Sequence, residues 1–202
     1  LTTLFGPLPL AFKQFAKVLA ALVLLYAAIA ILPPWGLTRD TTTGLNPSTW
    51  LTLLPFTIVM ILMQIGSEEL AFRGYLQTQL AARFRHPMVW MILPSALFAM
   101  GHHMPEVFGP NAWLITAWSF VFGLAAADLT ARTGTLGPAL ALHFANNFLA
   151  IAVMSMAGEM SGLALFHAPF GPGDTAALRA WLPVDLAMIG LCWLAARVAL
   201  RV

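Results

Sequence analysis

Residues 50–77 read WLTLLPFTIVMILMQIGSEELAFRGYLQ, and this stretch decides the class of fold. Its first part, Trp50–Ile65, is almost wholly apolar, and a helix needs about 20 apolar residues to cross the hydrocarbon core of a bilayer. Glu68, Glu69 and Arg73 follow in the inner part of the same segment. A charge inside a membrane helix costs about 2.5–3.5 kcal/mol on insertion scales. The stretch therefore predicts a membrane helix whose charged residues have a specific role.

The composition of the whole chain is that of an integral membrane protein. Of its 202 residues, 60% are hydrophobic and 9% are charged, whereas a soluble domain has about 25% charged residues. The mean hydropathy is +0.83. The net charge of +2 is too small to indicate a nucleic-acid partner. The single cysteine, Cys192, excludes an intramolecular disulfide and a cysteine-rich metal site.

Six segments are apolar and long enough to be membrane helices. They are residues 15–33, 50–70, 88–104, 111–130, 135–156 and 181–198. The first is too long for a cleavable signal peptide and lacks a small-residue cleavage site. We predict an all-α polytopic membrane helix bundle of about six transmembrane helices, with a single transmembrane domain over residues 1–202.

The lysines and arginines near the segment ends predict the orientation in the membrane, because cytoplasmic loops carry an excess of these residues. If the N-terminus is cytoplasmic, seven of them lie on that side: Lys13, Lys17, Arg83, Arg85, Arg132, Arg197 and Arg201. Arg39 and Arg179 then lie on the other side. We expect a multi-pass protein of a bacterial inner membrane with both termini cytoplasmic.

The three charged residues of the second segment divide into a pair and a single acid. Glu69 and Arg73 are four residues apart and share a helix face, so they can neutralise each other in a structural role. Glu68 is turned by about 100° from that pair and has no cation near it in the sequence. Poor solvation makes such a carboxylate more basic, which suits a general base. The alternative is that Glu68 only bonds to a neighbouring helix.

Glu68 and His102 are expected at one level of the bilayer. Each lies 15 residues from the turn at 83–87, and this distance is about 22 Å along a helix. The same geometry extends the second helix past the bilayer boundary to about residue 82. His143 lies about 14 Å up the fifth segment, so helix tilt must supply the difference.

The other polar residues of the segments are more easily interpreted as structural. Asp128 and Arg132 form another pair with a spacing of four. His103 is expected either to bond to a residue of the site or to lie at the membrane interface, and Asn146 is expected to bond to a neighbouring helix. Asp185 follows a proline, and we place it in the first turn of the last helix, where a carboxylate suits the helix dipole.

Two histidines and a glutamate on three helices can act on water in two ways. They can bind a zinc ion, as His₂Glu sites do, with Glu68, His102 and His143 as the ligands. Alternatively, Glu68 activates the water directly and His102 orients it, while His143 and Asn147 donate to the developing oxyanion. His143 and Asn147 are four residues apart and share a face. Either arrangement would hydrolyse an acyl bond.

Three motifs resemble those of one known family. Residues 68–73, EELAFR, resemble the EExxxR motif of the CAAX-processing and bacteriocin-processing (CPBP) intramembrane proteases. Residues 98–102, FAMGH, resemble the FxxxH motif of that family, and residues 143–147, HFANN, resemble its HxxxN motif. They occur in family order within residues 50–155, the expected catalytic core. The resemblance is to intramembrane glutamic endopeptidases related to type II CAAX prenyl proteases.

The resemblance implies a role for each motif residue. Glu68 would activate water with help from His102, and His143 and Asn147 would form the oxyanion hole. The supporting residues would be Glu69, Arg73 and Phe98. The resemblance implies that the protein needs no cofactor. An older label describes the family as metalloproteases, so zinc is the alternative.

The resemblance implies a peptide or membrane-protein substrate that reaches the site from the lipid bilayer or from the cytoplasmic face. A membrane-protein complex is also compatible with it, and nucleic acid is not expected. The chain contains no His-Glu-x-x-His motif and no Gly-x-Ser-x-Gly motif, which disfavours zinc site-2 and rhomboid-like proteases. The alternative from another class is a non-catalytic membrane partner, an assembly factor or immunity factor of the same family.

Overall fold

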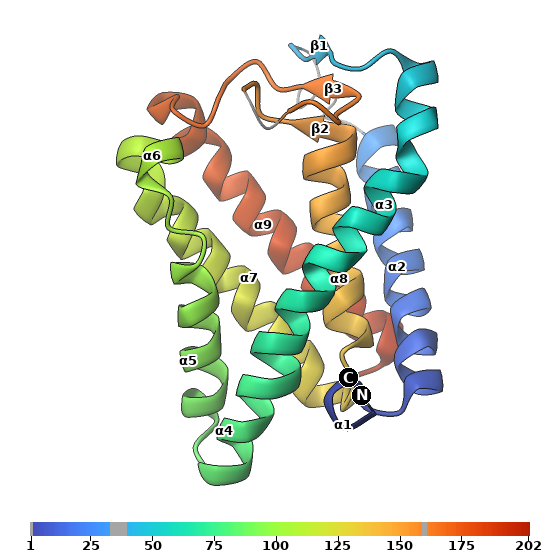
Figure 1. The fold of residues 1–202 in the computed structure, drawn as a ribbon, viewed down its shortest axis with the longest axis vertical. Coiled ribbons are helices and arrows are strands. Elements are labelled where there is room, and N and C mark those ends of the chain that lie inside the picture. Colours follow the sequence, from blue (N-terminus) through green and yellow to red (C-terminus); the bar gives the residue numbers. More distant parts are fainter. Residues whose placement is uncertain (1, 33–39, 159–160) are drawn as a thin grey trace.

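A computed structural model describes residues 2–32, 40–158 and 161–202. Six main helical stretches form a bundle (Figure 1). They are α2 (Leu8–Ile31); α3 (Pro47–Glu69) with the π-helix η2 (Leu70–Gln77) and α4 (Thr78–Arg83); α5 (Pro87–Met100); α7 (Ala112–Thr133); α8 (Gly137–Phe148) with the π-helix η4 (Leu149–Val153); and α9 (Thr175–Leu200). The predicted all-α membrane helix bundle is confirmed.

Four stretches of the described chain are long and apolar enough to cross a membrane: Thr3–Ile31, Pro47–Arg83, Pro105–Thr133 and Thr175–Leu200. Pro87–Met100 and Gly137–Val153 are shorter apolar helices. The expected extension of the second helix is also confirmed, since α4 ends at Arg83.

The shorter elements lie in the connections. They are α1 (Thr2–Phe5), α6 (Pro105–Phe108), the 3₁₀ turn η3 (Gly109–Asn111), β1 (Thr42–Thr43), β2 (Met154–Ser155) and β3 (Phe166–His167). The strands form a small sheet in the order β1-β3-β2, with β1 antiparallel and β2 parallel to β3. This sheet covers the end of the bundle opposite the two termini (Figure 1). Strands this short carry no periodic pattern, so the sequence did not predict them.

Four predicted boundaries are wrong. The first segment was expected to begin at residue 15, but α2 begins at Leu8. The third segment was expected to reach residue 104, but α5 ends at Met100, where a chain turn follows. The fifth segment was expected to reach residue 156, but its last residues form β2. The last segment was expected to begin at residue 181, but α9 begins at Thr175, one residue after its N-cap Asp174. The predicted end of the first segment, residue 33, and Arg39 lie outside the described residues.

Helix α8 lies at the centre of the bundle and is the element that brings the site together. It contacts α2, α3, α7 and α9. Most of its residues are buried, and small residues such as Ala139 and Ala141 let the neighbouring helices approach closely. Large apolar side chains on the outer helices are exposed, Phe12 at 75% and Leu24 at 71% among them, as expected for surfaces that face lipid.

The residues predicted to be structural have the expected partners in most cases. Arg132 Nε lies 2.8 Å from Asp128 Oδ1, and Trp193 Nε1 donates to Asp128 Oδ2 at 2.9 Å. The Nδ1 atom of His103 lies 2.9 Å from Thr116 Oγ1. These contacts fix the ends of α7 against its neighbours.

The position predicted for Asp185 is wrong. Because α9 begins at Thr175, Asp185 lies ten residues into the helix, about 15 Å from its start. It is therefore not a first-turn residue that interacts with the helix dipole.

Candidate active site

The predicted pair of Glu69 and Arg73 is present and completely buried. Arg73 Nη1 donates to Glu69 Oε1 at 3.1 Å, and both side chains are 0% exposed. Arg73 Nη2 also donates to the carbonyl oxygen of Gly123 on α7 at 3.2 Å. The guanidinium carbon lies 4.5 Å from the centre of the Phe98 ring on α5. Arg73 therefore joins three helical stretches and neutralises one carboxylate.

The helix changes its winding immediately after the two glutamates. Residues Leu70–Gln77 form the π-helix η2, which follows α3 without a break in the chain direction. π-helical turns are rare and are often found at functional sites. The sequence predicted an ordinary α-helix here, because no simple residue pattern distinguishes the two. Gly74 within η2 lies close to the chain of α1, since a Cβ atom there would be 3.2 Å from the Leu4 carbonyl oxygen.

His143 on α8 lies between the two glutamates of α3. Its Nδ1 atom is 2.7 Å from Glu69 Oε1, and its Nε2 atom is 3.6 Å from Glu68 Oε2. The residue is 3% exposed. The rings of Phe98 and Phe122 meet the imidazole edge-on, with centroid distances of 5.9 and 4.9 Å. These contacts hold the imidazole in one orientation.

Glu68, for which the sequence indicates no nearby cation, has a neutral partner on its own helix. Gln64, one turn earlier on α3, donates to Glu68 Oε1 at 3.2 Å. The other oxygen, Oε2, is buried and has no hydrogen-bond partner among the described residues, although His143 lies nearby. The side chain is 23% exposed. Glu68 is thus held at one oxygen, while its second oxygen points to the imidazole.

His102 lies just beyond the end of α5 rather than on the helix itself. Its Nδ1 atom lies 2.9 Å from the carbonyl oxygen of Phe98, and the two rings are 4.5 Å apart. Because a carbonyl oxygen can only accept, Nδ1 carries the hydrogen and Nε2 of a neutral ring keeps its lone pair. The spacing of four between Phe98 and His102 therefore does bring them together, but at a helix C-terminus.

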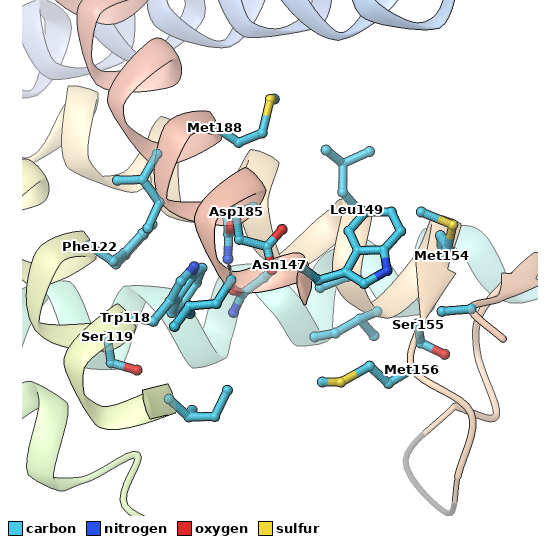
Figure 2. Close-up of a pocket in the computed structure, with 18 of the residues that line it drawn as sticks. Trp118, Ser119, Phe122, Asn147, Leu149, Met154, Ser155, Met156, Asp185 and Met188 are labelled. Atoms are coloured by element: carbon cyan, nitrogen blue, oxygen red, sulfur yellow. Dashed lines mark hydrogen bonds between the residues drawn. The ribbon is translucent and has the colours of Figure 1, made fainter. Parts of the chain in front are cut away.

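A cavity of about 650 Å³ connects these residues to the interior of the bundle. Gln64, His102, His143 and Asn147 line it, together with many apolar side chains. Figure 2 shows Asn147 among apolar lining residues such as Leu149 and Met154. Glu68 is not among its lining residues. Gln64 and His143, which contact the two carboxylate oxygens of Glu68, do line the cavity.

Two neighbouring amides of α8 are part of the cavity wall. Asn146 Nδ2 donates to Asn147 Oδ1 at 3.3 Å. Because the carbonyl oxygen of Asn147 accepts that bond, its own amide group is left to donate into the cavity. Asn146 was expected to bond to a neighbouring helix, but this bond joins it to Asn147 on α8 itself and orients the Asn147 amide.

The residues of the zinc alternative do not gather around one point. Among the residues that the structure describes, no group of three His, Cys, Asp or Glu side chains is arranged to hold a metal ion. His143 contacts a glutamate at each ring nitrogen, and Nδ1 of His102 is bonded to a backbone carbonyl. The arrangement described here does not fit a zinc site.

Sequence reasoning missed two polar residues of the cavity region. Gln64 is four residues before Glu68, so the same spacing rule that found Glu69 and Arg73 could have found it. Asp185 lines the cavity from α9, and its position depended on a helix start that the sequence did not reveal.

Comparisons with known proteins identify the family of the chain. Residues 49–149, half of the chain, match the family model described as type II CAAX prenyl endopeptidase Rce1-like. The chain is also 28% identical over 103 residues to the uncharacterised protein YyaK of Bacillus subtilis (strain 168), a match that covers 50% of this chain and 34% of that protein. No solved structure matches the chain. The matched residues include both glutamates, His102, His143 and Asn147, and the chain belongs to the Rce1-like family of type II CAAX prenyl endopeptidases.

Proposed function

We propose that the chain is an intramembrane endopeptidase that hydrolyses a peptide bond with a water molecule activated by Glu68. The observation that supports this most directly is the position of His143. It is held by Glu69 at one nitrogen, faces Glu68 at the other and forms part of the wall of a 650 Å³ cavity. Membership of the Rce1-like family supports a protease of the CAAX type.

In the proposed site His143 carries a hydrogen at both ring nitrogens, because each nitrogen faces a glutamate oxygen, which can only accept. Glu69 and Arg73 cancel, which leaves Glu68 as a negative charge. If His143 is protonated at both nitrogens, it donates Nδ1–H to Glu69 and neutralises Glu68. The four groups then carry no net charge, and this lowers the cost of burying them in a bilayer.

In the proposed reaction, Glu68 removes a proton from a water molecule, and the oxygen attacks the carbonyl carbon of the substrate. The carbonyl oxygen becomes negative and accepts hydrogen bonds from His143 Nε2–H and the amide of Asn147. The C–N bond then breaks, and the proton held by Glu68 passes to the leaving amine. His102 orients the water with the free lone pair of its Nε2 atom.

Removal of metal distinguishes the proposed reaction from the zinc alternative. We expect turnover to persist when purified protein is treated with a strong chelator and metal is removed completely. Loss of turnover that is restored by zinc would favour the alternative.

A peptidase assay tests the proposed function. The full chain is purified in detergent and incubated with a library of quenched fluorescent peptides, including CAAX peptides with and without a prenyl group. We expect turnover by the wild type and none by Glu68→Ala or His143→Ala. Equal background in all three proteins would favour the alternative of a non-catalytic assembly or immunity factor.

We also propose that both termini and the turn between α4 and α5 lie on the cytoplasmic side of a bacterial inner membrane. The two ends of the described chain lie at the same end of the bundle as that turn (Figure 1). Arg85→Cys and Gly173→Cys, each in a Cys192→Ser background, test the orientation. In intact spheroplasts, an impermeant maleimide is expected to label position 173 but not position 85.

A further inference from the structure

The cavity contains an acidic residue that the proposed reaction does not use. Asp185 lies on α9, beyond the residues that match the family model. Figure 2 shows Asp185 and Asn147 at the wall of the same cavity. An acid about 15 Å from the start of a membrane helix is costly, so the surroundings of Asp185 indicate its role.

Asp185 belongs to the inward face of α9. The buried residues of this helix are Leu178, Ile189, Cys192 and Ala196. Asp185 follows the first by seven residues and precedes the second by four, so it continues their stripe on one face of the helix. Asp185 is nevertheless exposed. Because the face points into the bundle, the carboxylate is accessible from the cavity rather than from lipid.

No cation neutralises Asp185 within the described part of the chain. Among the described residues that line the cavity there is no lysine or arginine, and Asp185 is the only Asp or Glu among them. No hydrogen bond or ion pair to Asp185 is found among the described residues. Its electrostatic neighbour is the hydroxyl of Tyr26, which is itself bonded to Cys192 Sγ at 3.2 Å.

A purely structural role does not account for this arrangement. An acid without partners inside a membrane protein costs free energy, and a leucine would pack better against the apolar cavity wall. A single carboxylate also cannot supply the several ligands of a metal site. What remains is a partner that enters the cavity and brings a positive charge.

We propose that Asp185 selects substrate segments that are mainly apolar but present one lysine or arginine side chain to the cavity. This inference rests on the proposed peptidase function, because the occupant of the cavity is then a peptide. The apolar wall accommodates the apolar residues of that peptide. The carboxylate of Asp185 pairs with the cation in a poorly hydrated space, where such a pair discriminates strongly against uncharged side chains.

The test compares matched peptides that carry lysine, norleucine or glutamate at one position, scanned along an apolar sequence. For wild type, we expect one position at which lysine raises kcat/KM by about tenfold or more over norleucine. Asp185→Asn should reduce this ratio to about one, and Asp185→Glu should retain it. Asp174→Asn is the matched control, because it removes a carboxylate from the same helix, at an N-cap that asparagine serves equally well. It should leave the ratio unchanged.

Binding separates this inference from the proposed function. Fluorescence anisotropy with labelled lysine and norleucine peptides needs no turnover, so Glu68→Gln should bind both as wild type does. If no peptide is cleaved but lysine peptides bind through Asp185, the peptidase function fails and the selection stands. The proposed selection is overturned if peptides are cleaved and the Asp185→Asn variant prefers lysine over norleucine as strongly as wild type does. The elution profile of this variant in size-exclusion chromatography shows whether it is folded. A wild type with no preference for lysine at any position would overturn the selection too.

Discussion

The Nδ1 atom of His143 on α8 lies 2.7 Å from Oε1 of Glu69 on α3. The same carboxylate also binds Arg73, so one buried group joins the two helices and neutralises the arginine. Glu69 is completely buried, whereas Glu68 is partly exposed and faces the other nitrogen of the same ring. Adjacent glutamates of one motif thus occupy different environments. This difference predicts that replacement of Glu69 affects stability, whereas replacement of Glu68 affects activity.

Replacement of Glu69 by glutamine should mainly destabilise the protein. The neutral amide leaves the Arg73 charge buried without its counter-ion, and breaking a buried pair costs about 3–5 kcal/mol. Glu68→Gln should leave the fold intact and lower kcat/KM by about 100-fold or more, the usual contribution of a general base. Thermal unfolding in detergent and peptidase assays on both variants measure the two effects. A stable Glu69→Gln protein with full activity would contradict this assignment.

The neighbouring histidines 102 and 103 should also behave differently. His103 bonds to Thr116, and its ring lies 4.2 Å from that of Trp113, so His103→Ala should lower the melting temperature and leave kcat/KM almost unchanged. His102 lines the cavity and has a free Nε2, so His102→Ala should reduce kcat/KM by about 100-fold with little change in stability. The same two measurements on both variants test this. Equal activity of the two variants would rule out a role for His102 at the water.

The fold was largely predictable because the bilayer imposes it. A membrane helix must be long, apolar and continuous. These properties are visible in residues 50–70 without knowledge of the helices that pack against them. The sheet of β1, β2 and β3 could not be predicted, since each strand has two residues and depends on segments far apart in the sequence. The π-helix η2 was missed for a related reason, because its winding depends on packing.

The site was predictable as a set of residues but not as a set of contacts. Helical spacing correctly paired Glu69 with Arg73 and Phe98 with His102. It could not reveal that His143 bonds to Glu69, because α3 and α8 are brought together only by the packing of the bundle. Asp185 was assigned to a helix start because Pro183 looked like a boundary, yet a membrane helix tolerates an internal proline.

The two amides of α8 give a third prediction. Asn147→Ala should lower kcat by about 10²–10³-fold if its amide donates to the oxyanion. Asn146→Ala removes only the group that orients Asn147, so it should lower kcat less and leave KM nearly unchanged. Steady-state kinetics of both variants distinguish a donor from a positioning residue. A larger loss in Asn146→Ala than in Asn147→Ala would reverse the assignment.

Two glycines test the packing that places α8 at the centre of the bundle. A Cβ atom at Gly137 would collide with the carbonyl group of Ala11 on α2, whereas at Gly190 on α9 it would meet nothing within 4 Å. Overpacking costs about 1–3 kcal/mol, and each kcal/mol moves Tm by about 2–4 °C in a chain of this size. Gly137→Ala should therefore lower Tm by about 5 °C and reduce activity, because α8 carries His143 and Asn147. Gly190→Ala, the matched control, should leave both unchanged. If Gly137→Ala melts with the wild type, α2 and α8 are not packed as closely as described here.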